Sequence, residues 1–249
     1  MKLRAENLSK AYHSHPVVNL PTTAFGEFGI EGLIGPNGAG KSTLMGLLTR
    51  RIAPTSGTIT LEDRDGGEHK LNGMQSFEVA RLGLVKTNQR ITGFDSLKIR
   101  DSLRLAATSH EVETIRGVIE DDPNSDEIET EIDHYLGQFS FADPDGYALS
   151  GGEKKLLDIL RCLIVKPQLL LMDEPTAGLP DDVTQAVMQL VTAKVKEGEM
   201  KVVIVEHDLD LIWSFCEYVH FLAEGEMLFQ GTPSEVKKNR LVAEKYMGV

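Results

Sequence analysis

The feature that most constrains the fold of this chain is a glycine-rich run near its N-terminus. The run reads Gly35-Pro36-Asn37-Gly38-Ala39-Gly40-Lys41-Ser42-Thr43. The apolar segment Ile30–Ile34 precedes it, and Leu44, Leu47 and Leu48 follow it at the spacing of one helix face. A strand that enters a glycine turn and leaves as a helix is typical of a phosphate-binding loop. The sequence therefore predicts a strand–loop–helix unit at this point.

The residue types in this run suit the binding of ATP with Mg²⁺. Glycines let backbone N–H groups turn inward around phosphate oxygens, and the following helix points its positive dipole end at the same anion. We expect Lys41 to reach the β- and γ-phosphates and the Ser42 hydroxyl to ligate Mg²⁺. A chance glycine turn is the alternative, and the strand before the run and the helix after it argue against that alternative.

The rest of the chain indicates an α/β fold. The continuous apolar segments Leu169–Met172 and Val202–Val205 alternate with helical patterns over Gly151–Val165 and Asp182–Glu197. Such strands indicate a parallel sheet covered on both faces. Residues 1–34 read as short strands with turns. Residues 91–148 carry helical patterns instead, over Ser96–Ala107 and Ile128–Phe139, which we expect to form a separate helical region.

Two acidic or basic clusters follow the predicted parallel strands directly. Asp173-Glu174 comes after Leu169–Met172, and Glu206-His207-Asp208 comes after Val202–Val205. Ligands bind at the carboxyl ends of parallel strands. Asp173 is therefore expected to hold Mg²⁺ and Glu174 to accept a proton from an attacking water, while His207 would contact the γ-phosphate or orient the water. The alternatives are a polar strand end that caps the next turn, and a structural histidine.

Composition excludes several other classes of protein. The net charge of −12 disfavours nucleic acid as a partner, because phosphate contacts need clustered Lys and Arg. No run of about 18 apolar residues is present, so no membrane-spanning helix is expected. Two cysteines, Cys162 and Cys216, are expected to be reduced thiols in a cytoplasmic protein. The acidic stretch Glu120–Glu127 reads as a solvated loop, with a cation or partner site as the alternative.

One further motif gives these features a family. Leu149-Ser150-Gly151-Gly152-Glu153 resembles the signature sequence of ABC-type ATPases, and it precedes the strand that ends in Asp173-Glu174. By itself the motif would be a capped helix start. The resemblance implies a P-loop NTPase fold with a RecA-like parallel sheet core, an N-terminal antiparallel β subdomain and an inserted α-helical subdomain. It implies one domain over 1–249, in which 1–88 and 152–249 form the core and 89–151 the helical signature subdomain.

The resemblance also assigns roles to individual residues. Tyr12 looks like the aromatic residue that stacks on adenine, although a partly buried strand tyrosine is the alternative. Gln89 looks like the glutamine that senses Mg²⁺ and the attacking water. Asp173, Glu174 and His207 match the metal-binding aspartate, the catalytic glutamate and the switch histidine. Three small residues, Ser150, Gly151 and Gly152, would bind the γ-phosphate held by an opposite subunit in a head-to-tail dimer.

Finer similarities concern the kind of transporter. The segments Met172–Leu179, Val205–Asp208 and Val242–Gly248 look like those of ATP-binding subunits of branched-chain amino acid or urea importers, and lipopolysaccharide-export ATPases are also similar. The leading hypothesis is an ATPase that energises a separate membrane permease, held at the inner face of the cell membrane by that permease. The alternatives are a soluble ABC-type ATPase, as in cluster assembly, and a non-hydrolysing regulator. Pro180-Asp181-Asp182 departs from the usual family pattern in the cross-dimer loop.

Overall fold

The computed structural model describes residues 1–13, 15–88, 97–107, 125–142 and 149–247. The chain forms two compact units. The first comprises residues 1–87, 167–175 and 188–249, and the second comprises 88–166 and 176–187. The first unit contains the glycine-rich run and the strands, and the second contains most of the helical middle of the chain.

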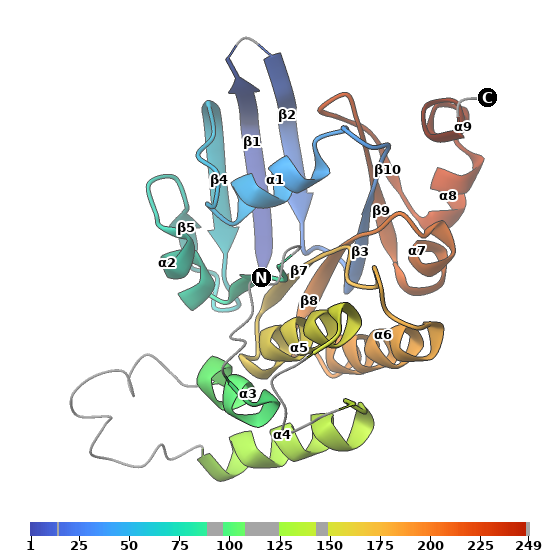
Figure 1. The fold of residues 1–249 in the computed structure, drawn as a ribbon. Helices are drawn as coiled ribbons and strands as arrows, with labels where there is room; N and C mark the ends of the chain where they lie inside the picture. The colour runs from blue at the N-terminus through green and yellow to red at the C-terminus, as the bar shows by residue number, and fades with distance from the viewer. Residues whose placement is uncertain (14, 89–96, 108–124, 143–148, 248–249) are drawn as a thin grey trace. The chain divides into compact units, whose positions relative to one another are not determined.

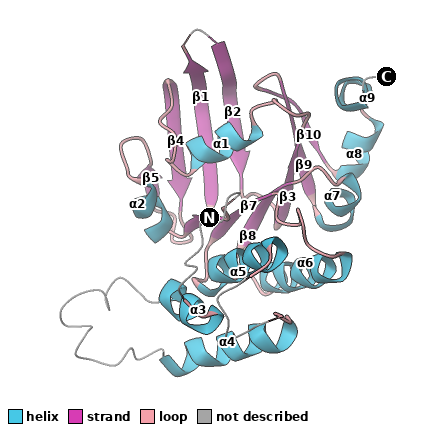
Figure 2. Ribbon diagram, viewed as in Figure 1, coloured by secondary structure: helices cyan, strands magenta, loops and turns pink. Residues whose placement is uncertain are grey.

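Among the residues that the structure describes, the strands form two sheets (Figure 2). In chain order they are β1 (Lys2–Tyr12), β2 (His15–Phe25), β3 (Ile30–Ile34), β4 (Ser56–Glu62), β5 (Glu68–Lys70), β6 (Leu84–Lys86), β7 (Leu169–Asp173), β8 (Lys201–Val205), β9 (Tyr218–Ala223) and β10 (Glu226–Gly231). One sheet has the antiparallel order β2-β1-β4-β5. The other has the order β10-β9-β3-β8-β7-β6, and only its β10–β9 pair is antiparallel.

The helices account for the remaining regular structure. They are α1 (Lys41–Leu48), α2 (Ser76–Arg81), α3 (Ile99–Ala107), α4 (Ser125–Gln138), α5 (Gly151–Ile164), α6 (Asp181–Lys196), α7 (Leu209–Phe215), α8 (Pro233–Lys238) and α9 (Arg240–Met247). Within the part of the chain that the structure describes, none of them is long and apolar enough to cross a membrane.

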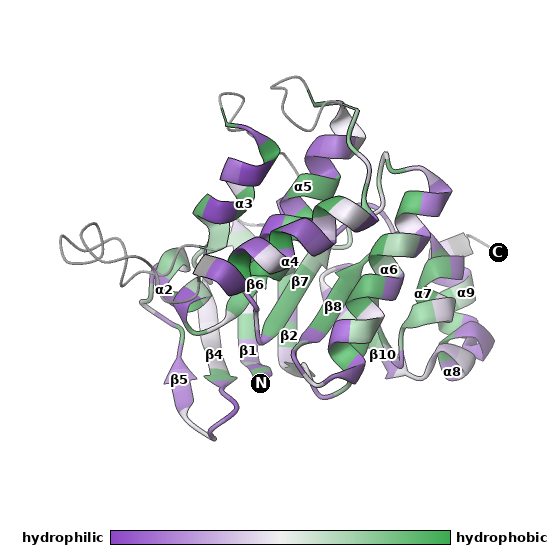
Figure 3. Cartoon of the chain, turned by 90° about the horizontal axis from the view of Figure 1, so that it is seen from below, coloured by the Kyte–Doolittle hydropathy of each residue, from purple (hydrophilic) through white to green (hydrophobic). Residues whose placement is uncertain are grey.

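Register in the parallel sheet brings the predicted site residues to one edge. Leu33 of β3 pairs with Val205 of β8, and Asp173 of β7 also pairs with Val205. The carboxyl ends of these three strands therefore lie side by side, as the sequence predicted for a parallel sheet. Every residue of β3 and β7 is buried, and Figure 3 shows the apolar colour along β7 and β8. Continuous apolar strands of this kind need cover on both faces.

The antiparallel sheet has one buried and one exposed face. Leu3, Ala5 and Leu8 of β1 are fully buried, whereas Lys2, Arg4 and Glu6 between them are exposed. The buried face belongs to one hydrophobic core with Leu44, Leu47 and Leu48 of α1, which runs across β1 and β2 in Figure 1. Truncation of one such leucine to alanine typically costs about 2–5 kcal/mol of stability. This packing fixes the position of α1, which is the helix that follows the glycine-rich run.

The second unit is built around α3, α4 and α5. Leu103, Ile132 and Tyr135 are fully buried in it. On its surface, Arg100 and Arg104 of α3 form ion pairs with Glu129 of α4. The two helices are thus joined by an apolar seam and a half-exposed charge cluster, and exposed pairs contribute little stability each.

Some elements differ from the sequence expectations. Ser125, Asp126 and Glu127 were expected in a solvated loop, and this part of the prediction is wrong, because they form the first turn of α4. Negatively charged side chains in a first turn interact favourably with the positive N-terminal end of the helix dipole. The rest of that acidic stretch lies outside the described residues. The short elements β6 and α2, and the C-terminal series from β9 to α9, had no counterpart in the sequence analysis. Cys162 and Cys216 are both buried and do not form a disulfide.

Candidate functional site

The glycine-rich run follows β3 without a break and turns tightly against neighbouring backbone. A Cβ on Gly35 would lie 2.0 Å from the Leu222 carbonyl oxygen of β9. A Cβ on Gly40 would lie 2.6 Å from the Val17 carbonyl oxygen, and the Gly40 φ of 102° is left-handed. Glycine is therefore required at both positions, because any side chain would displace backbone.

Lys41 is the first residue of α1 and is folded back over the run. Its Nζ donates to the carbonyl oxygens of Gly35 at 2.6 Å and Pro36 at 3.1 Å. Burial lowers the pKa of Lys41, and the nearby carboxylates of Glu174 and Asp173 oppose that shift. Gly40 caps α1 without a side-chain hydrogen bond, so the first backbone N–H groups of the helix have no side-chain acceptor there. This arrangement suits an anion.

A hollow of about 250 Å³ lies over the run. It is lined by Val17, Asn37, Gly38, Ala39, Gly40, Lys41, Ser42, Thr43, Glu174 and His207. Seven of the nine residues of the glycine-rich run, all except Gly35 and Pro36, thus share one cavity with the predicted catalytic pair. The volume suits a part of a nucleotide, since pockets that enclose a whole small molecule are typically about 300–1,000 Å³.

Glu174 and His207 both line this hollow and contact each other. His207 Nε2 lies 3.2 Å from Glu174 Oε1, and both side chains are partly exposed. The Glu174 N–H donates to the Val205 carbonyl at 2.8 Å, which ties the end of β7 to the end of β8. The Glu174 φ of 49° is left-handed, an uncommon conformation for a residue with a side chain and one that clusters at functional sites.

Asp173, the last residue of β7, directly precedes Glu174 and is only 2 % exposed. Its Oδ2 accepts from Lys86 Nζ at 2.8 Å, and its backbone N–H donates to Thr87 Oγ1 at 3.0 Å. Sequence reasoning missed Lys86. The apolar pair Leu84-Val85 before it belongs to edge strand β6, which pairs with β7, but this strand is too short to be recognised from the sequence.

The residues fit a Mg²⁺ ion that is shared with a nucleotide. Ser42 and Asp173 offer hard oxygen donors, the kind that Mg²⁺ prefers. No group of three or more His, Cys, Asp or Glu side chains that could hold a metal occurs among the described residues.

None of the remaining predicted residues is among those that line the hollow, and one of them lies outside the described residues. Tyr12 ends β1 with 45 % of its surface exposed, and Lys10 Nζ lies 5.0 Å from its ring centroid. Ser150 caps α5: its hydroxyl accepts from the Glu153 N–H, and Glu153 accepts from the Ser150 N–H at 2.9 Å. Gly151 and Gly152 form the first turn of α5. Gln89 lies outside the described residues.

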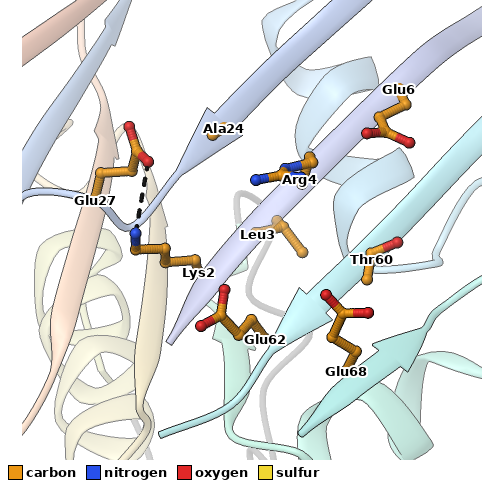
Figure 4. A pocket seen from close by; sticks show the side chains of 9 residues that line it. All are labelled: Lys2, Leu3, Arg4, Glu6, Ala24, Glu27, Thr60, Glu62 and Glu68. Atoms are coloured by element: carbon orange, nitrogen blue, oxygen red, sulfur yellow. Dashed lines mark ion pairs between the residues drawn. The ribbon is translucent and has the colours of Figure 1, made fainter. Parts of the chain in front are cut away.

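A second hollow opens on the exposed face of the antiparallel sheet (Figure 4). Its volume is about 190 Å³, and its charged lining residues are Lys2, Arg4, Glu6, Glu27, Glu62 and Glu68. Lys2 and Glu27 form a long ion pair across it, at 3.8 Å. None of the predicted site residues lines it, and its alternating charges are those of the solvated face of a sheet.

Strand, glycine turn, helix and a carboxylate–histidine pair at the ends of adjacent parallel strands define a nucleotide-binding protein of the P-loop class. The family model described as ABC transporter matches residues 22–177. The chain therefore belongs to the ABC transporter family and is its ATP-binding, ATP-hydrolysing subunit, in which hydrolysis is coupled to transport.

Two relatives match over most of their length. The high-affinity branched-chain amino acid transport ATP-binding protein LivG of Salmonella typhimurium is 30% identical over 228 residues, which cover 88% of this chain and 87% of the relative. The lipopolysaccharide export system ATP-binding protein LptB of Escherichia coli is 28% identical over 249 residues, covering 99% and 97%.

Solved structures confirm the predicted fold class. A nucleotide-free ATP-binding cassette from an ABC transporter matches with a TM-score of 0.79 and 22% identity, covering 100% of both chains. A dimeric bacterial ABC transporter cassette matches with a TM-score of 0.75 and 21% identity, covering 93% of this chain and 98% of the other. ABC cassettes dimerise and pair with permease subunits in transporter complexes. Family membership favours the transport hypothesis over cluster assembly or a non-hydrolysing regulator.

Proposed function

We propose that this subunit energises uptake of amino acids through a separate permease, with Glu174 as the general base of ATP hydrolysis. The observation that carries the catalytic assignment is the 3.2 Å contact between His207 Nε2 and Glu174 Oε1 at the hollow that Lys41 and Ser42 line. The likeness to LivG, at 30% identity, supports the substrate class. The likeness to LptB makes lipid export the second candidate.

In this mechanism the chain's own groups bind the phosphates and move one proton. Lys41 Nζ exchanges its contacts with the Gly35 and Pro36 carbonyls for oxygens of the β- and γ-phosphates, and the N–H groups at the start of α1 bind the same oxygens. Glu174 accepts the proton of the attacking water, and His207 holds Glu174 and the water in line. Bound Mg²⁺, held by Ser42 and Asp173 and sensed by Gln89, would neutralise charge on the phosphates.

The proposed site is complete only in a dimer. Ser150, Gly151 and Gly152 of one subunit bind the γ-phosphate on the phosphate loop of the other, and Tyr12 stacks on adenine. Residues 1–88 with 152–249 act as the core and 89–151 as the helical signature subdomain. The subunit would then sit at the inner face of the membrane through its permease. ATPase activity should rise more steeply than linearly with protein concentration, and strict proportionality down to high dilution would contradict the shared site.

Glu174→Gln tests the general base. The amide keeps the shape of the side chain and cannot accept the proton, so turnover should fall by about 10²–10⁴-fold while ATP binding is retained. Turnover is measured as phosphate release and binding as quenching of a fluorescent ATP analogue. The matched control is Glu224→Gln, because Glu224 is also a non-glycine residue with positive φ at a strand end and lies in a surface ion pair with Lys245. Wild-type turnover in Glu174→Gln would exclude the assignment.

The substrate is tested separately. Uptake of radiolabelled leucine by cells that carry the subunit with its permease should require Glu174. If Glu174→Gln instead abolishes lipid export and leaves leucine uptake unchanged, lipid export is favoured as the function.

A further inference from the structure

Lys86 holds a position that the proposed mechanism does not use. It is the last residue of β6, and only 9 % of its side chain is exposed. Its Nζ lies 2.8 Å from Asp173 Oδ2 and also donates to the Thr87 carbonyl at 3.1 Å. A lysine ammonium is strongly hydrated in water and is seldom buried without a charged partner. The partner in this case is the carboxylate proposed to hold the metal.

The backbone around this pair is rigidly tied. Thr87 is fully buried; its N–H donates to the Leu171 carbonyl at 2.9 Å, and its hydroxyl accepts from the Asp173 N–H at 3.0 Å. These bonds continue the β6–β7 pairing beyond Lys86 and fix the separation of the two strand ends. Lys86 is thus held beside Asp173 by main-chain contacts as well as by its own charge.

Asp173 is therefore a buried carboxylate that is influenced by two lysines. Lys86 contacts it directly, and Lys41 is near enough for the two charges to interact. An ammonium that neutralises a carboxylate lowers the attraction of that carboxylate for a second cation, and the effect is larger in a site shielded from water. A divalent ion must then bind against the charge of Lys86 or displace its Nζ from Oδ2.

We propose that Lys86 is a built-in counter-cation of Asp173 that competes with Mg²⁺ for this carboxylate and thereby sets the Mg²⁺ concentration that the subunit requires. The inference rests on the proposed role of Asp173 as a metal ligand. Lys86 is a positioning residue in this scheme, because it acts on the nucleotide only through Asp173. A purely structural role, in which Lys86 only joins β6 to β7, predicts no change in Mg²⁺ affinity when its charge is removed.

The test is Lys86→Met, which keeps the length of the side chain and removes the charge. The thermal midpoint of the protein is measured with a fixed concentration of a non-hydrolysable ATP analogue while MgCl₂ is titrated. Ligand binding raises the midpoint by mass action. The half-saturating Mg²⁺ concentration should fall at least roughly fivefold in the variant, as expected when a like charge is removed a few ångströms from the ion. An unchanged or higher half-saturating concentration would overturn the proposal.

Three further variants make the result specific. Lys86→Gln also removes the charge but retains a hydrogen-bond donor. If Lys86→Met does not fold, Lys86→Gln should show the same decrease in half-saturating Mg²⁺ concentration. Lys86→Arg keeps the charge and should titrate like the wild type. Lys201→Met is the matched control: Lys201 lies on β8 in the same sheet, but its Nζ contacts the Gly26 carbonyl at 2.5 Å instead of a carboxylate. A fall in Lys201→Met equal to that in Lys86→Met would also overturn the proposal.

Asp173→Asn separates this inference from the proposed function. If Asp173→Asn titrates with Mg²⁺ like the wild type, Asp173 is not a metal ligand and both proposals fail. If Asp173→Asn loses the Mg²⁺ response while Lys86→Met titrates like the wild type, the metal site stands and only the role of Lys86 is excluded.

Discussion

Two buried carboxylates in the same parallel sheet have opposite surroundings. Glu31 of β3 is 1 % exposed: its Oε1 accepts from the backbone N–H groups of Glu27 and Phe28 at 2.7 and 2.9 Å, and its Oε2 lies 2.9 Å from His220 Nε2. Asp173 of β7 is equally buried, but it lies at the carboxyl end of its strand, between Thr87, Lys86 and the residues of the phosphate hollow.

Glu31 pairs with His220 and Asp173 pairs with Lys86, and the two pairs differ in the groups that surround them. His220 also places its Nδ1 3.0 Å from Gln230 Oε1, and its ring packs against Phe25 and Tyr218, so the Glu31 network is closed on all sides by its own fold. Lys86 and Asp173 instead adjoin Glu174 and Lys41. A carboxylate beside a nitrogen group thus belongs to an internal network of the sheet in one place and lies next to the proposed phosphate site in the other.

The largest expected effect is that of Asp173→Asn on catalysis. Loss of one oriented group that stabilises charge at the reacting phosphate should lower the ATPase rate by about 10²–10³-fold. The rate is measured well below the thermal midpoint, so that the protein is folded throughout. A loss that disappears when the rate is expressed per folded molecule would place Asp173 with Glu31 as a structural carboxylate.

The second effect is that of Glu31→Ala on stability. His220 loses its partner, and two backbone N–H groups lose their acceptor, so the free energy of unfolding should fall by about 3–5 kcal/mol. Urea denaturation measures this change. Binding of a fluorescent ATP analogue to the folded fraction should be unchanged. A folded variant that no longer binds the analogue would mean that Glu31, like Asp173, contributes to ligand binding.

A smaller effect distinguishes buried from exposed histidine–carboxylate pairs. His220→Leu should cost about 1–3 kcal/mol, because Glu31 keeps only its backbone donors. The matched control is His69→Leu, whose Nε2 lies 2.8 Å from Asp63 Oδ2 in a partly exposed hairpin. Exposed pairs contribute about 0–1 kcal/mol, so the control should be nearly neutral. Equal losses in the two variants would mean that burial does not distinguish these pairs.

The smallest effect is a pH dependence at the functional end of the sheet. Burial lowers the pKa of Lys41 below its ordinary 10.5, so the unfolded chain binds that proton more tightly than the folded protein does. Stability is therefore reduced below the folded pKa and is regained as pH rises from there toward 10.5. Lys41→Met should remove this increment, which is measured as the difference between the two proteins in thermal midpoint from pH 7 to pH 10. An identical pH profile in the variant would contradict the burial effect.

The parallel half of the fold could be predicted from sequence for a simple physical reason. Leu169–Met172 and Val202–Val205 are continuously apolar because both sheet faces are covered, and each ends in charged residues because the strand ends there. The same patterns predicted where Asp173, Glu174 and His207 would lie. The glycine-rich run could also be recognised from the sequence, because Gly35 and Gly40 occupy positions where a side chain would clash with the backbone.

The remainder depends on contacts that local patterns do not contain. β6 is a strand of three residues with one buried side chain, which is too short to show an alternating pattern. The sequence alone does not distinguish Lys86 from a surface lysine, because its burial depends on the pairing of β6 with β7. Glu31 and His220 meet only because β3 and β9 are neighbours in the sheet. No periodicity in the sequence links two such residues, so their pairing needs the three-dimensional structure.

The place of β3 in the sheet also has a consequence for how the chain matures on the ribosome. The phosphate loop is synthesised before β8 and β9, but β3 pairs with both of these strands, and Gly35 lies against the Leu222 carbonyl of β9. Long-range pairing of this kind is slow and comes late. ATP can therefore stabilise this subunit only after β8 and β9 have been synthesised, and until then both edges of β3 lack the strands with which they pair.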